Sequence, residues 1–303
     1  MHSGPADSAA QQESDKQNMT EEELKFSYFK TEPIPDHILE RRDACRRKGM
    51  IVPEETLSKR PSQIEGIREA SRINTLVLDE VASKIRTGMT TQEIDDIVRE
   101  FTAAQGAICA PYHFEGYPKS VCTSINNEVC HGIPAKHRKL HEGDIINVDA
   151  TTIYKGYYGD ASRMFFIGKC SDARVKLVNE TKKCLEIGLE AAKPWNTVGD
   201  IGAAISKYAR SKGYSVVREL GGHGVGVDFH EDPFVAHEGR AHTGMVLVPG
   251  MVITIEPMIN AGRAGVVIDP YNGWTIYTKD NSDSAQWEHT ILITETGNEI
   301  LSY

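Results

Sequence analysis

The sequence predicts an α/β domain made of two similar halves with a site between them. Two pairs of segments carry this prediction, and both are related by one shift of 107 residues. TTQEIDDIVREFTAAQG at 90–106 aligns with NTVGDIGAAISKYARSKG at 196–213, and GDIINVD at 143–149 aligns with GMVITIE at 250–256. A weak repeat arises easily by chance, but two separate pairs with one shift favour an internal duplication.

Helices and strands are predicted in chain order from the spacing of apolar side chains. The second predicted helix can be capped by Thr90 or Thr91 and ended by Gly106. A period close to 3.6 residues indicates the helices, and short apolar runs indicate the strands. The predicted elements are helices at 64–85, 90–106 and about 172–192, and strands at 144–154 and 162–168.

The first 60 residues are predicted to form an N-terminal extension that precedes one domain at 61–303. Residues 1–20 are polar and poor in aromatic side chains, which is typical of disordered chain, and Met19 is an alternative start. RRDACRRKG at 41–49 is expected to be a short basic helix or a solvated turn. A structural or linker role is favoured there over partner docking.

Composition excludes several classes of protein. The 303 residues are 40% hydrophobic, which is enough for a large core. A net charge of −9 argues against nucleic-acid binding, because phosphate neutralisation needs a basic surface. There is no apolar run long enough to span a membrane and no apolar leader. Six irregularly spaced cysteines are typical of reduced thiols, so we expect a cytoplasmic protein.

Four acidic residues stand beside apolar strand residues: Asp149, Asp160, Glu256 and Glu288. Asp149 and Asp160 are eleven residues apart, which suits adjacent antiparallel strands joined by a turn at YKGYYG. Any one of the four could be a strand-edge acid that faces water. Four buried carboxylates together are costly unless they are paired or bind metal, so the set favours a metal site.

His223 is the candidate imidazole of that site and lies in the glycine-rich run GGHGVG. Glycines allow the backbone to approach a crowded centre and aim the ring inward. Several carboxylates with one imidazole suit two divalent cations of intermediate hardness. The run lacks the spacing and the Lys-Ser/Thr pair of a phosphate-binding loop, so we reject that reading.

The motifs as a set resemble the methionine aminopeptidases, which have the pita-bread metallopeptidase fold. The resemblance covers about 61–303, which would be the catalytic domain, and the motifs occur in the family's order. It implies a pseudo-twofold antiparallel sheet with helices on its outer face and a dinuclear metal site between the halves. The motifs are KSVCTSINNEVCHGIP, VDATTIYKGYYGDASRMF, GGHGVGVDFHEDP, TIEPM and QWEHTILIT.

The resemblance assigns the metal ligands residue by residue. Asp160 and Glu288 would bridge two divalent ions, and Co, Mn, Fe or Zn would each suit this shell. A monovalent cation site would lie near Asn126 and Ser284. The five implied ligands of the divalent ions are Asp149, Asp160, His223, Glu256 and Glu288.

The same resemblance implies the catalytic groups and the substrate pocket. His131 and His230 would hydrogen-bond the scissile peptide, and Glu256 would act as the general acid and base. Many relatives have an aromatic residue and a histidine before the glycine that precedes Tyr117, whereas this chain has Phe114 and Glu115. That departure affects the fit of the substrate. The implied pocket residues are Phe114, Tyr117, Cys122, His131, Phe229, His230 and Trp274.

The implied reaction is removal of the N-terminal methionine from nascent proteins and peptides with a small second residue. Only 32 residues separate Glu256 from Glu288, which leaves no room for the helical insertion of the type II enzymes and favours type I. We expect a monomer that binds peptides or nascent chains, contacts the ribosome transiently and binds neither membranes nor specific nucleic acids. Two alternatives are an Xaa-Pro peptidase, which usually carries a large N-terminal domain, and a non-enzymatic relative, which usually loses ligands.

Overall fold

A nine-stranded antiparallel sheet forms the centre of the computed structural model, which describes residues 31–303. Its strands are paired in the order β1-β4-β5-β14-β9-β7-β8, with β2 beside β4 and β15 beside β14. The expectations for residues 1–20 and Met19 lie outside the described residues. The strands are β1 Ile108–Cys109, β2 Cys122–Ile125, β4 Ile145–Tyr154, β5 Tyr157–Phe166, β7 Gly222–Gly224, β8 Glu231–Val235, β9 Val252–Ile255, β14 Glu288–Ile293 and β15 Asn298–Ser302.

Two three-stranded sheets, β13-β10-β6 and β11-β12-β3, accompany the large sheet. Their strands are β3 Glu128–Cys130, β6 Ser215–Val216, β10 Met258–Asn260, β11 Val266–Ile268, β12 Ile276–Thr278 and β13 Ser284–Gln286. Strands β10 to β13 fill the interval between Glu256 and Glu288. That interval contains no helix, as the short spacing predicts.

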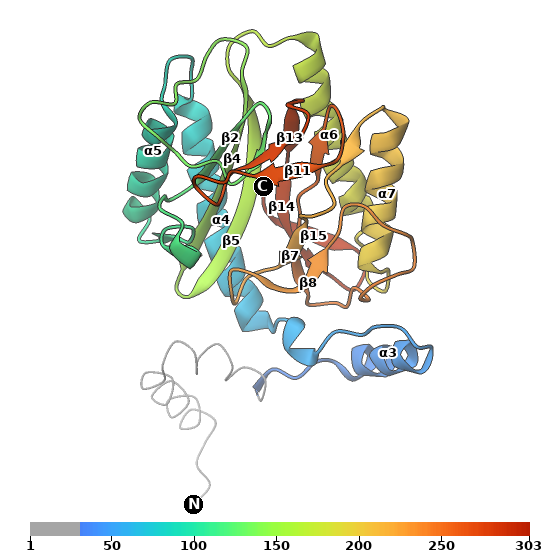
Figure 1. Cartoon of the computed structure of the whole chain (residues 1–303). Coiled ribbons are helices and arrows are strands. Elements are labelled where there is room, and N and C mark those ends of the chain that lie inside the picture. Colours follow the sequence, from blue (N-terminus) through green and yellow to red (C-terminus); the bar gives the residue numbers. More distant parts are fainter. Residues whose placement is uncertain (1–30) are drawn as a thin grey trace, which may run out of the picture.

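The internal duplication is visible as two helix pairs that flank the sheet, α4 with α5 and α6 with α7 (Figure 1). Helix α5 and helix α7 begin and end at positions related by the predicted shift of 107 residues, and so do the starts of β4 and β9. Each of α5 and α7 starts with a threonine capping box, at Thr90 and Thr197. The helices are α4 Pro61–Lys84, α5 Thr91–Ala104, α6 Asp172–Ala191 and α7 Val198–Ser211.

Each half has its own apolar core between its helices and the sheet. One core joins α4 and α5 to β4 and includes Val77 and Val148. The other joins α6 and α7 to β9 and β14 and includes Ile205 and Ile253. Burial of these side chains holds the two halves of the sheet against their helices and leaves the opposite face for the site.

The three predicted helices and the strand at 144–154 are confirmed with small shifts of their ends, whereas the strand predicted at 162–168 begins earlier, at Tyr157. The chain between β4 and β5 turns at Lys155 and Gly156, which both have positive φ, at 49° and 78°. A two-residue turn of this kind matches the twist of antiparallel strands. The turn brings Asp149 and Asp160 onto neighbouring strands, as their spacing predicts.

Residues 31–60 pack against the domain that follows. Of the two expected alternatives for 41–49, a short basic helix or a solvated turn, the helix is confirmed, because residues 41–47 form the second half of α3 (Asp36–Arg47). The short helix η1 spans Glu55–Leu57. The guanidinium of Arg42 is fully buried, and Ile34 and Ile38 belong to the same core as α6 and α7. The proposed domain boundary at residue 60 stays a prediction.

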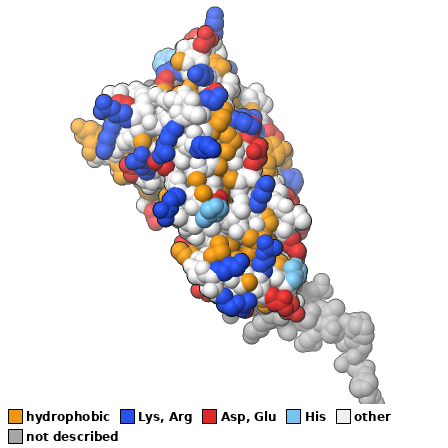
Figure 2. Space-filling model, turned by 90° about the vertical axis from the view of Figure 1, so that its right-hand side faces the viewer, with side chains coloured by type: hydrophobic (Ala, Val, Ile, Leu, Met, Phe, Trp, Pro, Cys, Tyr) orange, Lys and Arg blue, Asp and Glu red, His pale blue; other side chains and the backbone are white. Residues whose placement is uncertain are grey.

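The surface carries charges of both signs. On the face in Figure 2, Lys and Arg side chains are scattered among acidic and apolar ones. Within the described part of the chain, no helix is both long and apolar enough to cross a membrane.

Candidate metal centre

Strand register places the four acids on one face of the sheet. Asp149 pairs with Ser162, and Thr151 pairs with Asp160, so both aspartates point to the same side of the β4–β5 ribbon. Glu288 on β14 also pairs with Ser162 and therefore shares this face. Glu256 follows the last residue of β9, directly beside β14.

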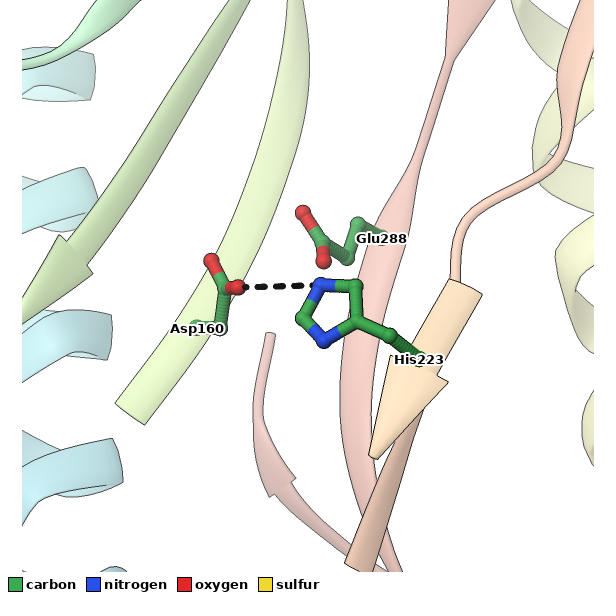
Figure 3. A group of neighbouring side chains, drawn as sticks. All are labelled: Asp160, His223 and Glu288. Atoms are coloured by element: carbon green, nitrogen blue, oxygen red, sulfur yellow. Dashed lines mark ion pairs between the residues drawn. The ribbon is translucent and has the colours of Figure 1, made fainter. Parts of the chain in front are cut away.

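His223 completes the group from the other half of the sheet. Its Nε2 lies 3.7 Å from an oxygen of Asp160 and 3.7 Å from an oxygen of Glu256. Asp160, His223 and Glu288 each offer a ligand atom within 4.8 Å of the others. Figure 3 shows these three side chains converging from β5, β7 and β14. This separation suits a cation between them better than direct hydrogen bonds.

Burial and mutual repulsion set the protonation of the group. Burial raises the pKa of Asp149 to about 7. It also raises the pKa values of Asp160, Glu256 and Glu288 well above their usual range, and the neighbouring carboxylates raise them further. Burial, and then His230, lowers the pKa of His223 to about 4, so its imidazole is neutral at pH 7. A neutral imidazole is the form that binds metal.

The donor set fits divalent cations. The hydrogen bonds that Asp160 and Glu256 accept from side chains come from neutral groups, the hydroxyls of Thr151 and Thr254 and the amide of Gln286. These donors orient the carboxylates but do not neutralise them. Several buried carboxylates with one imidazole need positive charge from elsewhere, and a metal ion supplies it.

Sequence reasoning missed these three orienting side chains, although a signal was present. Thr151, Thr254 and Gln286 each lie two residues from an assigned ligand, at Asp149, Glu256 and Glu288 respectively. Because side chains alternate across a strand, a residue two positions away shares the ligand's face. Polar residues at that offset are therefore candidates for orienting a metal ligand.

The glycines around His223 allow neighbouring strands to approach the backbone closely. A Cβ at Gly222 would lie 2.3 Å from the carbonyl oxygen of Thr254, and one at Gly224 would lie 2.2 Å from that of Asp232. The close approach that the structure shows is therefore between β7 and its neighbouring strands, and the expected approach of this backbone to a metal centre stays a prediction. The glycines let β7 fit between β8 and β9, and the ring of His223 points to the acids as a result.

One cavity of about 710 Å³ joins the acids to an apolar pocket. Tyr117 is buried and donates its hydroxyl to the carbonyl of Gly132 at 3.0 Å. Its ring packs edge-on against Trp274, with centroids 5.2 Å apart. The cavity is lined by every proposed ligand and pocket residue: Phe114, Tyr117, Cys122, His131, Asp149, Asp160, His223, Phe229, His230, Glu256, Trp274 and Glu288.

Two further histidines face the cavity beside the acids. The ring of His230 lies 4.4 Å from that of His223, centroid to centroid, and stacks on Phe229 at 4.3 Å. Burial lowers the pKa of His131 to about 4 and also lowers the pKa of His230, which Glu115 raises in part. Both imidazoles are therefore neutral donors or acceptors at pH 7.

The expected monovalent cation residues lie together, outside this cavity's lining. The backbone N–H of Ser284 donates to the carbonyl of Asn126 at 2.8 Å. The side chain of Asn126 donates to Asp144, and the hydroxyl of Ser284 donates to Asn260. A cation site there stays a prediction.

Comparison with known proteins places this geometry in a family. Residues 65–295 match the model of metallopeptidase family M24. Methionine aminopeptidase A from Synechocystis sp. is 51% identical over 247 residues, which cover 81% of this chain and 96% of that protein. The crystal structure of methionine aminopeptidase from Rickettsia prowazekii superposes with a TM-score of 0.79 at 40% identity, covering 84% of this chain and all of that one.

A more distant structure shares the fold at lower similarity. Xaa-Pro dipeptidase from Bacillus anthracis gives a TM-score of 0.63 at 26% identity. The match covers 81% of this chain but 62% of that one, so the dipeptidase is much longer.

A carboxylate-rich centre on a duplicated antiparallel sheet defines a metal-dependent hydrolase of the pita-bread fold. The match to the family model and the identity to the relatives narrow this class to one family. The chain belongs to metallopeptidase family M24 and, within it, to the methionine aminopeptidases.

Proposed function

We propose that the protein removes N-terminal methionine from peptides and nascent chains whose second residue is small, as a type I enzyme. One observation carries the proposal: a single cavity connects the carboxylate and imidazole group to an apolar pocket. A methionine side chain needs an apolar slot, and its neighbouring peptide bond must reach the metal ligands. The identity of the relatives, at 51% for the Synechocystis protein, supports the same activity.

Five side chains would hold the metal: Asp149, Asp160, His223, Glu256 and Glu288. We propose that they would hold two divalent ions, and Mn, Fe, Co and Zn would all suit the mixed shell. When bound, such ions supply Lewis acidity at the scissile carbonyl and an acidified water.

The chain's own groups perform the remaining steps. The Glu256 carboxylate, oriented by Thr254 and Gln286, accepts a proton from the attacking water and passes it to the leaving amine. His230 and His131 hydrogen-bond the scissile peptide, and their bonds strengthen as negative charge develops on the carbonyl oxygen. Burial keeps both rings uncharged, so each can donate from its protonated nitrogen.

The pocket would select methionine by shape and polarisability. Tyr117, Cys122, Phe229 and Trp274 line it, and thioether sulfur packs well against aromatic edges. Phe114 contacts Phe229 with ring centroids 4.7 Å apart, so aromatic rings fill one wall. We expect the second residue of the substrate to lie beside this wall, where a bulky side chain would not fit.

The proposal extends to the setting of the reaction. All six cysteines are free in the structure, which supports a reducing, cytoplasmic environment. The enzyme would act as a monomer and contact the ribosome briefly. Its natural substrates would be nascent chains.

Metal removal and peptide choice test this function together. Metal-free protein should not cleave Met-Gly-Met, and adding back Mn, Fe, Co or Zn in turn should restore cleavage to different extents. At saturating metal, Met-Ala peptides should be cleaved far faster than Met-Lys peptides. Equal rates on both would contradict the narrow-pocket argument, and cleavage of Xaa-Pro peptides alone would favour the other activity of the fold.

A further inference from the structure

The loop that carries Phe229 and His230 has a support outside the metal site. This loop connects β7 to β8, and both rings line the active-site cavity. The rings contact each other and His223, so the position of the loop sets the position of His230 relative to the metal ligands. A group that fixes the loop therefore affects the reaction without touching substrate.

Glu231, the first residue after the loop, accepts hydrogen bonds from the loop backbone and from Lys59. One oxygen of its carboxylate accepts the backbone N–H groups of Val227 at 2.8 Å and Asp228 at 3.0 Å. The other oxygen accepts a hydrogen bond from the ammonium of Lys59. The Lys59 and Glu231 side chains are only 3% and 9% exposed. A buried, hydrogen-bonded ion pair is weakly screened and depends on both partners.

Lys59 is itself held firmly by the segment that precedes the first long helix. Its backbone N–H donates to the carbonyl of Gly250 at 2.8 Å. The buried guanidinium of Arg42 donates to the hydroxyl of Ser58 and to the carbonyl of Pro53. The backbone at Lys59 is therefore held in place, and its ammonium reaches the loop from this fixed position.

Packing alone does not hold the loop on this side. A second cavity, of about 250 Å³, lies between η1 and the loop and is lined by Thr56, Leu57, Lys59 and Glu231 among others. Apolar contact is therefore incomplete where the ion pair forms, and the pair supplies a specific link between the two segments.

We propose that Lys59 is a positioning residue for the reaction: through Glu231 it holds the loop that places Phe229 and His230 in the active site. The inference rests on the proposed substrate-side role of His230. It assigns a function to Lys59, which lies 172 positions before Glu231 in the sequence and precedes the predicted domain boundary.

Lys59→Met removes the ammonium and keeps an unbranched apolar side chain of similar length up to the ε position. We expect kcat on a Met-Ala peptide to fall on the order of 10- to 100-fold, because a small misplacement of a catalytic group is costly. KM should rise less than kcat falls, because Phe229 is one of several residues that line the pocket, and the stoichiometry of bound metal should change little. Lys59→Arg should recover most of the activity. Lys155→Met is the matched control, since it breaks an exposed Lys–Glu pair with Glu69 and should leave kcat unchanged.

A double-mutant cycle separates positioning from general stabilisation. In a His230→Ala background, Lys59→Met should lower kcat less than 3-fold, because the catalytic group that it positions is gone and only the pocket residue Phe229 remains. An equal loss in both backgrounds would overturn the inference. If Lys59→Met does not fold, Lys59→Gln, which keeps a donor, takes its place in the cycle with the same two outcomes. Full activity of His230→Ala would instead overturn the proposed role of His230. If His230→Ala loses activity but the Lys59 variants do not, only the positioning role of Lys59 is overturned.

Discussion

His223 and His230 are seven residues apart, and their rings are in contact, yet their surroundings differ. The Nε2 of His223 faces oxygens of Asp160 and Glu256. The ring of His230 instead contacts Phe114 and Phe229. One imidazole is therefore surrounded by acids and the other by the aromatic wall of the pocket, which supports two different roles.

Alanine substitutions should separate these roles. His223→Ala should lower metal affinity and activity together, because it removes one ligand. His230→Ala should spare metal binding and lower kcat on the order of 10²–10³, with a smaller effect on KM, because the bond strengthens in the transition state. Calorimetric titration with Mn²⁺ and kinetics at saturating metal would decide. If His230→Ala loses metal as badly as His223→Ala, both rings belong to the metal shell.

At the scale of the element, strands β8 and β9 lie very close to the backbone of β7. Gly222 and Gly224 bring its backbone against β9 and β8, where a side chain has no room. The backbone N–H of His223 donates to the hydroxyl of Thr254, which in turn donates to Glu256. The close packing of β7 and β9 therefore also sets the distance between His223 and Glu256, two of the proposed metal ligands.

A methyl group on this strand should disturb both stability and the site. Gly222→Ala puts a Cβ where the Thr254 carbonyl lies 2.3 Å away, so the strands must move apart. We expect a loss of about 1–3 kcal/mol in the free energy of unfolding, and weaker metal binding. Gly297→Ala is the control, because a Cβ there has no atom within 4 Å. Urea unfolding of both variants measures the difference, and equal midpoints would contradict the argument.

At the scale of the whole molecule, the two halves contribute equivalent parts to one charged centre. Asp149 on β4 and Glu256 after β9 are related by the internal duplication. Together with Asp160 and Glu288 they put four carboxyl groups with raised pKa values between the two cores. Stability of the metal-free protein must therefore depend on pH.

The sign follows from proton binding. These four carboxyl groups ionise near pH 4 in the unfolded chain and at higher pH in the folded one, so the folded state binds more protons. The stabilisation is complete below the unfolded pKa and is lost as pH rises through the folded values. Buried His131 and His223 have pKa values lowered to about 4, so they make stability rise with pH. Their effect ends at about pH 6.5, where the unfolded imidazole loses its proton.

Metal-free protein should therefore lose stability from pH 7 to pH 9. The slope should be about 1.4 kcal/mol per pH unit for each proton that the folded state still holds. Urea unfolding at several pH values measures it. Asp149→Asn should reduce the slope, whereas exposed Glu69→Gln should not. Saturating Mn²⁺ should flatten the profile, and a metal-free protein that is more stable at pH 9 than at pH 7 would refute the argument.

The sequence by itself determined the elements that depend on local chemistry. The cap at Thr90, the turn at Lys155–Gly156 and the apolar stripes of the helices act between residues a few positions apart, and the structure confirms them. The matching cap at Thr197 was not predicted, although the shift of 107 residues aligns it with Thr90. The motifs also gave the proposed ligands and pocket residues, which the structure gathers around one cavity.

Only the tertiary structure decided the contacts between distant segments. The spacing of GGHGVG indicates crowding, but not that the crowding partners are Thr254 and Asp232. The basic run at 41–49 contains Arg42, which folding buries against Ser58 and Pro53. The link from Lys59 to Glu231 joins segments 172 residues apart and leaves no periodic pattern. Such contacts form because packing brings unrelated surfaces together, so no local rule in the chain encodes them.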